Sequence, residues 1–186
     1  MSEAKLSDED KTQLLTLARS IIKHKLTGEP IENGPADNER LSEPRGAFVT
    51  LHKQGQLRGC IGTFTSKQSL ADTITEMAIS ASQQDPRFNP VHQEELADID
   101  IEISALTPLR PIENVSEIEV GTHGIYITRG YRSGVLLPQV ATEQGWNREQ
   151  FLQHTCIKAG LPPDAWQAEE TKIEIFSAEV FGEKEV

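Results

Sequence analysis

The segment with the most distinctive chemistry is Leu57-Arg58-Gly59-Cys60-Ile61-Gly62, in which a cysteine stands between two glycines. Glycines weaken a β-strand and are tolerated where a bulge occurs or another group approaches the backbone. Arg58 comes two residues before Cys60, and such residues share one face of a strand. A nearby guanidinium favours the thiolate, the form that acts as a nucleophile or metal ligand. The alternative is that Cys60 is a small, inert packing residue.

The face that Cys60 occupies depends on the turn at Gln54-Gly55. A two-residue loop needs positive φ at both central positions, which suits glutamine poorly, and it would pair Val49 with Cys60. We therefore expect a three-residue loop that pairs Phe48 with Cys60, because a slip of one residue changes every neighbour of the thiol. In that register one face carries Phe48, Thr50, His52, Arg58 and Cys60.

A loop flanked by prolines supplies a second group of candidates, Arg87 and Phe88. Arg87 could bind a carboxylate or phosphate of a ligand. It could equally form a surface ion pair with one of the many acidic residues. Phe88 could anchor a partner protein, as could Trp146 and Trp166.

Polar side chains on predicted strands and strand ends form a third group. Glu102 and Ser104 alternate with apolar residues over 98–106, so they lie on the polar face, where solvent exposure is the default. If a second lobe covered that face, Glu102 would become a candidate base or arginine partner. Gln139 follows Pro138 at an abrupt strand end, which is either a ligand-binding opening of the backbone or a plain strand-to-helix junction.

The remaining sequence contains no metal or cofactor signature. The five histidines are scattered, and none forms a ligand pair with another histidine or a cysteine. A Ser-His-Asp pattern, a phosphate-binding loop and a dinucleotide fingerprint are all lacking. We therefore expect no metal and no cofactor. Cys156 is expected to pack in the core on the apolar side of its helix.

The composition limits the classes of partner. The chain has 186 residues and a net charge of −11. Residues 41–90 contain four acids and five bases, whereas residues 91–186 contain 17 acids and seven bases. This balance argues against nucleic acid and anionic membranes as partners. Two cysteines and the lack of an apolar leader or membrane-length run lead us to expect a cytoplasmic protein.

The elements that position these residues predict an α+β fold with antiparallel strands. A capping box at Ser7 and Asp10 begins a helix that ends at Gly28. Two blocks of hairpin, helix and strand follow, as two lobes at about 46–110 and 120–181 that share one core within a single domain, 1–186. A degenerate duplication is expected, since residues 46, 48, 49 and 50 match 124, 126, 127 and 128, and 101–103 match 173–175. The last strand is expected over 172–180.

At the hexapeptide the chain resembles the AMMECR domain family. The match continues through 85–88, 101–108, 132–141, 144–146 and 159–166, and covers about residues 14–181. Within the family it is similar to the prokaryotic protein A of the AmmeMemoRadiSam system, whose name records three genes often found together. The resemblance implies a duplicated α+β fold with an extra N-terminal helix and C-terminal strand. It also implies a functional cleft between the lobes around the hexapeptide, and it assigns no reaction.

Two functional hypotheses follow, and the sequence leaves open whether the protein is an enzyme. In the first, Cys60 is the nucleophile of an enzyme acting on a small anionic substrate. Arg58 would then stabilise the thiolate or bind the anion, Gly59 and Gly62 would supply oxyanion-binding N–H groups, and Arg87 and Glu102 would orient the substrate. In the second, the protein is a non-catalytic module or scaffold for the Memo-like and radical S-adenosylmethionine proteins that the resemblance implies. The hexapeptide would then only shape a rigid hairpin.

Overall fold

The structure is a computed structural model that describes residues 5–31 and 38–184. The chain divides into two compact units, Met1–Leu106 with Glu179–Val186, and Thr107–Ala178. The expected α+β class is confirmed, with five α-helices and two antiparallel four-stranded sheets in the described parts. The buried apolar side chains form two clusters, each within one unit. Each unit therefore has an apolar cluster of its own, and one core shared by two lobes within a single domain, 1–186, stays a prediction.

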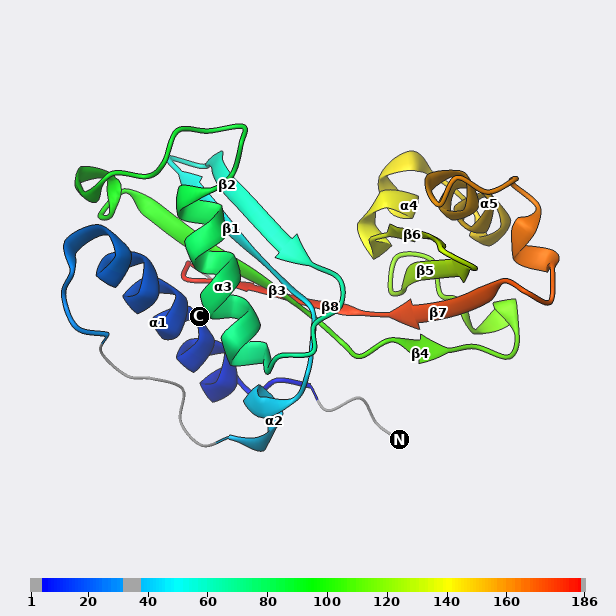
Figure 1. Ribbon diagram of the computed structural model, residues 1–186, viewed down its shortest axis with the longest axis horizontal. Coiled ribbons are helices and arrows are strands. Elements are labelled where there is room, and N and C mark those ends of the chain that lie inside the picture. The colour runs from blue at the N-terminus through cyan, green and yellow to red at the C-terminus, as the bar shows by residue number, and fades with distance from the viewer. Residues whose placement is uncertain (1–4, 32–37, 185–186) are drawn as a thin grey trace. The chain divides into compact units, whose positions relative to one another are not determined.

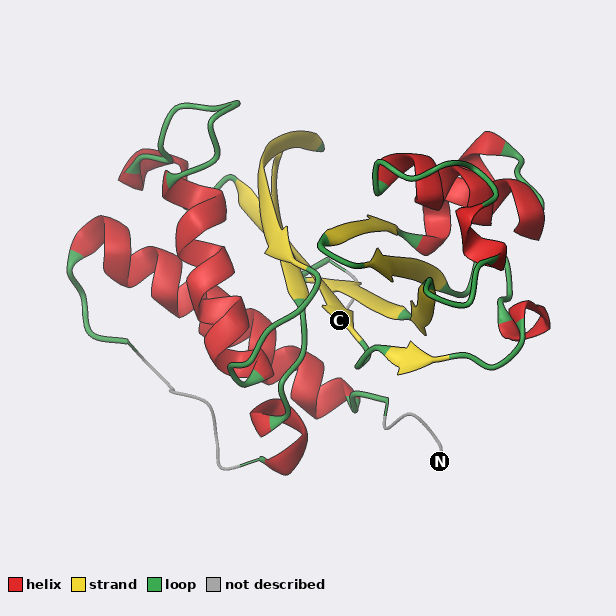
Figure 2. Cartoon of the chain, turned by 45° about the vertical axis from the view of Figure 1, so that its right-hand side comes forward, coloured by secondary structure: helices red, strands yellow, loops and turns green. Residues whose placement is uncertain are grey.

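The first unit packs helices on one face of a sheet (Figures 1 and 2). The strand order is β2 (Gln56–Thr63), β1 (Ala47–Lys53), β3 (Ile99–Leu106) and β8 (Ala178–Gly182). The helices are α1 (Asp8–Thr27), α2 (Glu39–Ser42) and α3 (Leu70–Gln83). As the alternation of β3 predicts, Ile101 and Ile103 are buried with the helices, while Glu102 and Ser104 lie on the opposite face.

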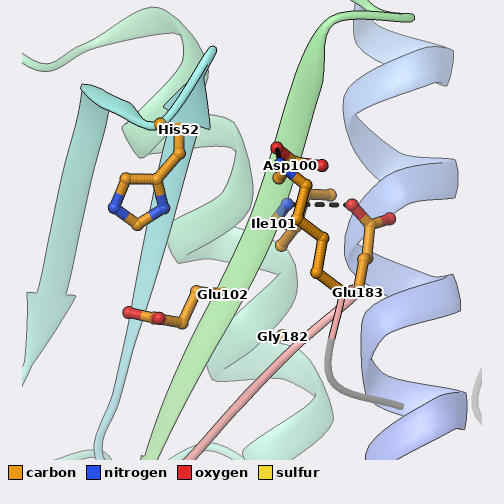
Figure 3. A pocket seen from close by; sticks show the side chains of 8 residues that line it. His52, Asp100, Ile101, Glu102, Gly182 and Glu183 are labelled. Atoms are coloured by element: carbon orange, nitrogen blue, oxygen red, sulfur yellow. Dashed lines mark hydrogen bonds and ion pairs between the residues drawn. The ribbon is translucent and has the colours of Figure 1, made fainter.

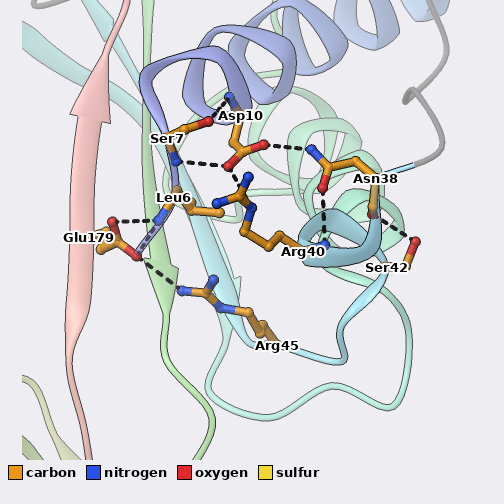
Figure 4. Close-up of polar contacts among 8 residues, drawn as sticks. All are labelled: Leu6, Ser7, Asp10, Asn38, Arg40, Ser42, Arg45 and Glu179. Carbon is orange, nitrogen blue, oxygen red and sulfur yellow. Dashed lines mark hydrogen bonds and ion pairs between the residues drawn. The ribbon is translucent and has the colours of Figure 1, made fainter. Parts of the chain in front are cut away.

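A polar network fastens the start of α1 to the rest of the first unit (Figure 4). The predicted capping box is present, since Ser7 and Asp10 bond to each other's backbone N–H groups. The buried Asp10 also accepts a hydrogen bond from Asn38 and pairs with Arg40 at the start of α2. Nearby, Glu179 of β8 accepts the backbone N–H of Leu6 and pairs with the buried Arg45. The extra N-terminal helix and C-terminal strand are thus joined to one sheet.

The second unit has the same general plan. Its sheet runs β4 (Arg110–Pro111), β7 (Lys172–Phe176), β5 (Gly124–Arg129) and β6 (Arg132–Leu136), with helices α4 (Pro138–Gln144) and α5 (Arg148–Lys158). Asn147 caps α5, and Cys156 is fully buried in the apolar cluster, as expected. Burial raises the pKa of the Cys156 thiol.

The single last strand expected over 172–180 is wrong. The structure divides this segment into β7 in the second sheet and β8 in the first. Ser177, which lies between them, exchanges two hydrogen bonds of 2.8 Å with Thr107, one through each backbone N–H group. Strand-like alternation continues through both strands, so the local pattern hides the passage from one sheet to the other.

The order of hairpin, helix and strand recurs in both units, although a duplication stays a prediction. In each unit the first strand pairs with the third, Leu51 with Ile101 and Ile127 with Ile173. If residues 101–103 are matched to 173–175, these pairs match Leu51 to Ile127, whereas the predicted match of the first strands has Val49 at this position. The two predicted matches therefore differ by two residues in register. Short alternating strands match equally well at such a shift because both positions face the core.

Candidate functional site

The turn that leads to Cys60 differs from the expected one. Lys53 pairs with Gln56, so the loop has two residues, and both have positive φ, 54° at Gln54 and 77° at Gly55. These angles match a type I′ turn, which fits the right-handed twist of the flanking strands. The preference against glutamine in this conformation is therefore outweighed by the strand geometry, and the favoured three-residue loop is wrong.

A β-bulge then changes the register before Cys60 is reached. His52 pairs with Leu57, but Leu51 pairs with Gly59, so Arg58 is the extra residue. Consequently Thr50 lies opposite Cys60, and neither of the two partners considered from the sequence, Phe48 or Val49, does. The Thr50 hydroxyl donates a hydrogen bond of 3.2 Å to the partly exposed Cys60 sulfur.

The bulge directs Arg58 to an internal partner. Its Nε and Nη2 atoms each lie 3.0 Å from one carboxylate oxygen of Glu95, in a short 3-10 helix, Gln93–Glu95. Its Nη1 atom donates to the carbonyl of Asn89. Lys53 also binds Glu95, at 3.0 Å. The hydrogen bonds from Arg58 lower the pKa of Glu95 to about 2, so the guanidinium is neutralised over the physiological range.

Both glycines of the hexapeptide are required by close packing. A Cβ atom on Gly59 would lie 2.2 Å from the carbonyl oxygen of Ala81 in α3. On Gly62 it would lie 2.2 Å from the ring of Phe48, which is the register partner of Gly62 on β1 and covers it on the same face of the sheet. These residue types therefore have a structural explanation that needs no ligand.

The backbone of Cys60 is bound by the loop that follows α3. Because β2 is an edge strand, the Cys60 N–H and C=O turn away from β1. The N–H donates to Asp85 at 2.9 Å, and the C=O accepts from Arg87 at 3.0 Å. Alternate residues of such a strand face its neighbour, so the Gly59 N–H is directed toward β1 and away from any ligand at the edge.

Asp85 and Arg87 also bind each other. Two guanidinium atoms of Arg87 lie 2.9 and 2.7 Å from the Asp85 oxygens, and the Arg87 N–H adds a bond of 3.1 Å. The Arg87 guanidinium holds the pKa of the buried Asp85 carboxyl well below its usual range. The guanidinium also lies 5.5 Å from the ring of Phe88, so this loop forms a closed charge pair beside an aromatic ring.

The polar face of the first sheet, opposite α1 and α3, brings together the side chains that these contacts leave available. We call it the Cys60 face, and its residues stand in adjacent rungs of β2, β1 and β3. Cys60, Thr50 and Glu102 form one rung, and Gly62, Phe48 and Ser104 form the next. Among the described residues, none forms a hydrogen bond or ion pair with the Glu102 carboxylate. The next rung, toward the turn, contributes His52 and Asp100.

A pocket of about 270 Å³ lies at the turn end of this face (Figure 3). His52 and Glu102 project into it from β1 and β3, and Gly182 lies beside them on β8. The other charged groups are paired, since Lys184 binds Asp100, and Glu183 accepts the Ile101 N–H at 2.8 Å and binds Arg19. Glu102 is therefore the carboxylate of this pocket that remains unpaired within the described residues.

The other predicted site residue, Gln139, belongs to the second unit. It lies in the first turn of α4, directly after Pro138 at the first helical position. Trp146, one of the three candidate anchors, stacks on His154 with ring centroids 3.9 Å apart. Trp166 packs against the apolar cluster of the same unit.

Sequence reasoning missed the roles of Asp85 and Glu95, and it missed that His52 and Glu102 line one pocket. Asp85 could have been found from the sequence, because an acid two residues before an arginine can form a local ion pair with it. Glu95 could not, since its role depends on a contact with Arg58 from a distant segment. The described parts of the chain contain no cluster of three or more metal-binding side chains. They also contain no helix that is long and apolar enough to cross a membrane.

Comparison with known proteins shows the family. Residues 15–181 match the AMMECR1 family, so the chain belongs to it and the resemblance is confirmed. A protein of Methanothermobacter thermautotrophicus is 46% identical over 190 residues, covering 98% of this chain and 99% of the relative. Protein MK0488 of Methanopyrus kandleri is 47% identical over 191 residues, covering 97% and 92%. The crystal structure of protein PH0010 from Pyrococcus horikoshii has a TM-score of 0.78 at 41% identity and covers 98% of this chain and 95% of its own.

Proposed function

We propose that the protein is a non-catalytic binding module that holds a partner protein on the Cys60 face. One observation carries this proposal: the charged and backbone groups of the hexapeptide are bound within the first unit. Arg58 is held by Glu95, and the Cys60 backbone by Asp85 and Arg87. These contacts support the role of a rigid hairpin that presents a surface.

A small anionic ligand fits this geometry poorly. Both nearby guanidinium groups are already paired with carboxylates, so neither offers an uncompensated positive charge. The unpaired group is instead the Glu102 carboxylate, in a pocket of about 270 Å³ next to His52. A carboxylate accepts hydrogen bonds only, so its natural partner is a lysine, an arginine or an amide N–H of another protein.

The partner candidates are the Memo-like and radical S-adenosylmethionine proteins implied by the resemblance, and a cytoplasmic location stays a prediction. Binding of each partner to the full chain can be measured by calorimetry at physiological salt. We expect Glu102→Gln to weaken binding about tenfold, because it removes the charge from a contact at the centre of the face.

Glu174→Gln is the matched control, since Glu174 is a partly exposed strand carboxylate on β7 of the second unit. The control should bind like the unaltered protein. Cys60→Ser should also keep binding within about twofold, because the hydroxyl preserves the polar contact with Thr50. Equal affinity of the Glu102 and Glu174 variants, or no binding of either partner, would argue against this function.

A cysteine-dependent enzyme is the second candidate, and the Cys60–Thr50–Glu102 rung supports it. The thiol is partly exposed, accepts a hydrogen bond from a hydroxyl, and lies on the same face as an unpaired carboxylate. A reacting thiol would need to lose its proton, and Glu102, in the same rung, is an available acceptor. Substrate turnover would distinguish the enzyme from the module.

The alkylation rate of Cys60 against pH gives a first answer before any substrate is known. Cys156 serves as an internal control because it is fully buried. A midpoint well below the reference thiol pKa of about 8.5 would support the enzyme. If Glu102→Gln then slowed alkylation of Cys60 without changing Cys156, the carboxylate would be its base. A rate no faster than that of Cys156 would leave the binding module as the better account.

A further inference from the structure

A second binding surface, independent of the Cys60 face, occurs at the end of the β5–β6 hairpin in the second unit. Tyr131 at its tip is 93% exposed, which is unusual for a large aromatic side chain. Beside it lies a hollow of about 340 Å³, bounded by Arg129, Arg132, Leu161 and Pro162 with Tyr131. The lining of the hollow thus combines one aromatic ring, two guanidinium groups and two apolar side chains.

The two arginines of this hollow repel each other across the hairpin. Arg129 and Arg132 are directly opposite each other across the two strands. Like charges in this position repel and destabilise a hairpin. The ion pair of Arg129 with Glu170 is long, at 3.6 Å, and Glu170 is 71% exposed, so it offsets this repulsion weakly.

The hollow is formed before any partner arrives. Arg132 donates a hydrogen bond to the carbonyl of Gly160, which fixes the hairpin end against the turn that follows α5. Its guanidinium also lies 5.9 Å from the Tyr131 ring centroid. A preformed surface loses less conformational entropy on binding than a mobile one. Tyrosine and arginine are also the residue types that contribute most to binding at protein interfaces.

We propose that this hollow, which we call the Tyr131 hollow, docks an acidic polypeptide segment that carries an apolar or proline side chain. The two arginines would pair with carboxylates of the segment, and its apolar side chain would pack on Leu161 and Pro162 beneath Tyr131. Charge complementarity favours this occupant, because two arginines line the hollow and, among the described residues, a single long ion pair with an exposed glutamate is all that offsets their charge. Nucleic acid fits less well, since the net charge of −11 repels a phosphate backbone.

The test uses a fluorescein-labelled peptide, Glu-Glu-Leu-Pro-Glu-Glu, and the same peptide with lysine in place of each glutamate. Binding to the full chain is measured by fluorescence anisotropy at low and physiological salt. Changes in the backbone amide NMR chemical shifts of the isotope-labelled protein locate the binding site. We expect the acidic peptide to bind, to weaken as salt is added, and to shift the amides of residues 129–132.

Variants of the Tyr131 hollow should weaken this binding selectively. Tyr131→Ser should reduce affinity about tenfold and, because the ring is exposed, should leave the fold intact. Arg129→Glu should reduce it by at least as much at low salt. Lys67→Glu is the matched control, since it makes the same change in net charge at an exposed residue of the first unit. It should bind like the unaltered chain.

Four results would overturn the proposal. The lysine peptide could bind equally well, or the Lys67 variant could lose as much affinity as the Arg129 variant. A single-stranded oligonucleotide could bind in preference to the acidic peptide. Sedimentation could reveal a dimer that Tyr131→Ser abolishes, which would make a second copy of this chain the occupant.

Discussion

Replacement of Asp85 by alanine tests whether the hexapeptide is held by the loop beside it. The Asp85 side chain is 2% exposed and accepts hydrogen bonds from two backbone N–H groups, those of Cys60 and Arg87, as well as from the Arg87 guanidinium. Asp85→Ala removes all of these acceptors at once. It leaves the Cys60 N–H on an edge strand without its partner.

The expected cost follows from these contacts. A hydrogen bond to a charged group contributes about 1.5–3 kcal/mol, and two backbone donors lose one each. The Arg87 side chain is 54% exposed and regains solvation, so its ion pair adds little. Relief of the desolvation of a buried carboxylate offsets part of the loss. We therefore expect unfolding to become easier by about 2–3 kcal/mol, which for a chain of 186 residues lowers the Tm by about 4–12 °C.

Urea unfolding and amide hydrogen exchange together provide the assay. The two units can unfold separately, so a residue-specific measurement is needed beside the global one. The Cys60 amide should exchange about 30–150-fold faster in the variant, which is the same free energy expressed as a rate. Asp164→Ala is the control, because Asp164 is exposed and its side chain caps no helix. Equal stability of the two variants, with unchanged exchange at Cys60, would refute this reasoning.

Three further predictions concern the same fold. The pKa of Glu95 is about 2 in the folded chain against 4.5 ordinarily, so its contribution to the free energy of unfolding is complete above pH 4.5 and is lost as the pH falls toward 2. Glu95→Gln should lower the free energy of unfolding in urea by about 2–3 kcal/mol near pH 6 and make it less dependent on pH between pH 5 and 2.5. Parallel pH profiles of the variant and the unaltered protein would contradict this. Gly59→Ala should destabilise by about 1–3 kcal/mol in urea, since its Cβ would lie 2.2 Å from the Ala81 carbonyl. Gly182→Ala is the control, because its Cβ would lie 3.5 Å from the nearest atom, and it should lower the free energy of unfolding by under about 1 kcal/mol. Similar losses of stability in the two variants would exclude the steric explanation. Cys156 is fully buried, so it should react with iodoacetamide only when the second unit unfolds. A reaction rate in the folded protein close to the rate in urea would contradict this.

Local physics made much of the fold predictable. A capping box depends on residues three apart, so Ser7 and Asp10 predicted the start of α1. Strict alternation predicted which side chains of β3 are buried, Ile101 and Ile103 among them. The family was also predictable, because its blocks extend over nearly the whole chain.

The candidate site was less predictable because its contacts join distant segments. Cys60, Arg58, Arg87 and Glu102 all lie in the first unit, but the contacts that they make or lack there were not predictable. Arg58 was expected beside the thiol and instead binds Glu95, 37 residues later in the chain. A charged side chain pairs with the opposite charge that the fold brings closest to it, and the distance between two residues far apart in the sequence cannot be read from the sequence.

The sequence by itself determined the class of fold, the caps of its main helices, the buried faces of its strands and the family. These features depend on residues a few positions apart, where backbone geometry sets the spacing. Tertiary structure alone decided the bulge at Arg58, and with it that Thr50 faces Cys60. It also decided that Asp85 binds the Cys60 backbone and that Glu102 stays unpaired among the described residues. A one-residue shift in register reverses every side chain of a strand, and only the packing of the whole unit selects among such registers.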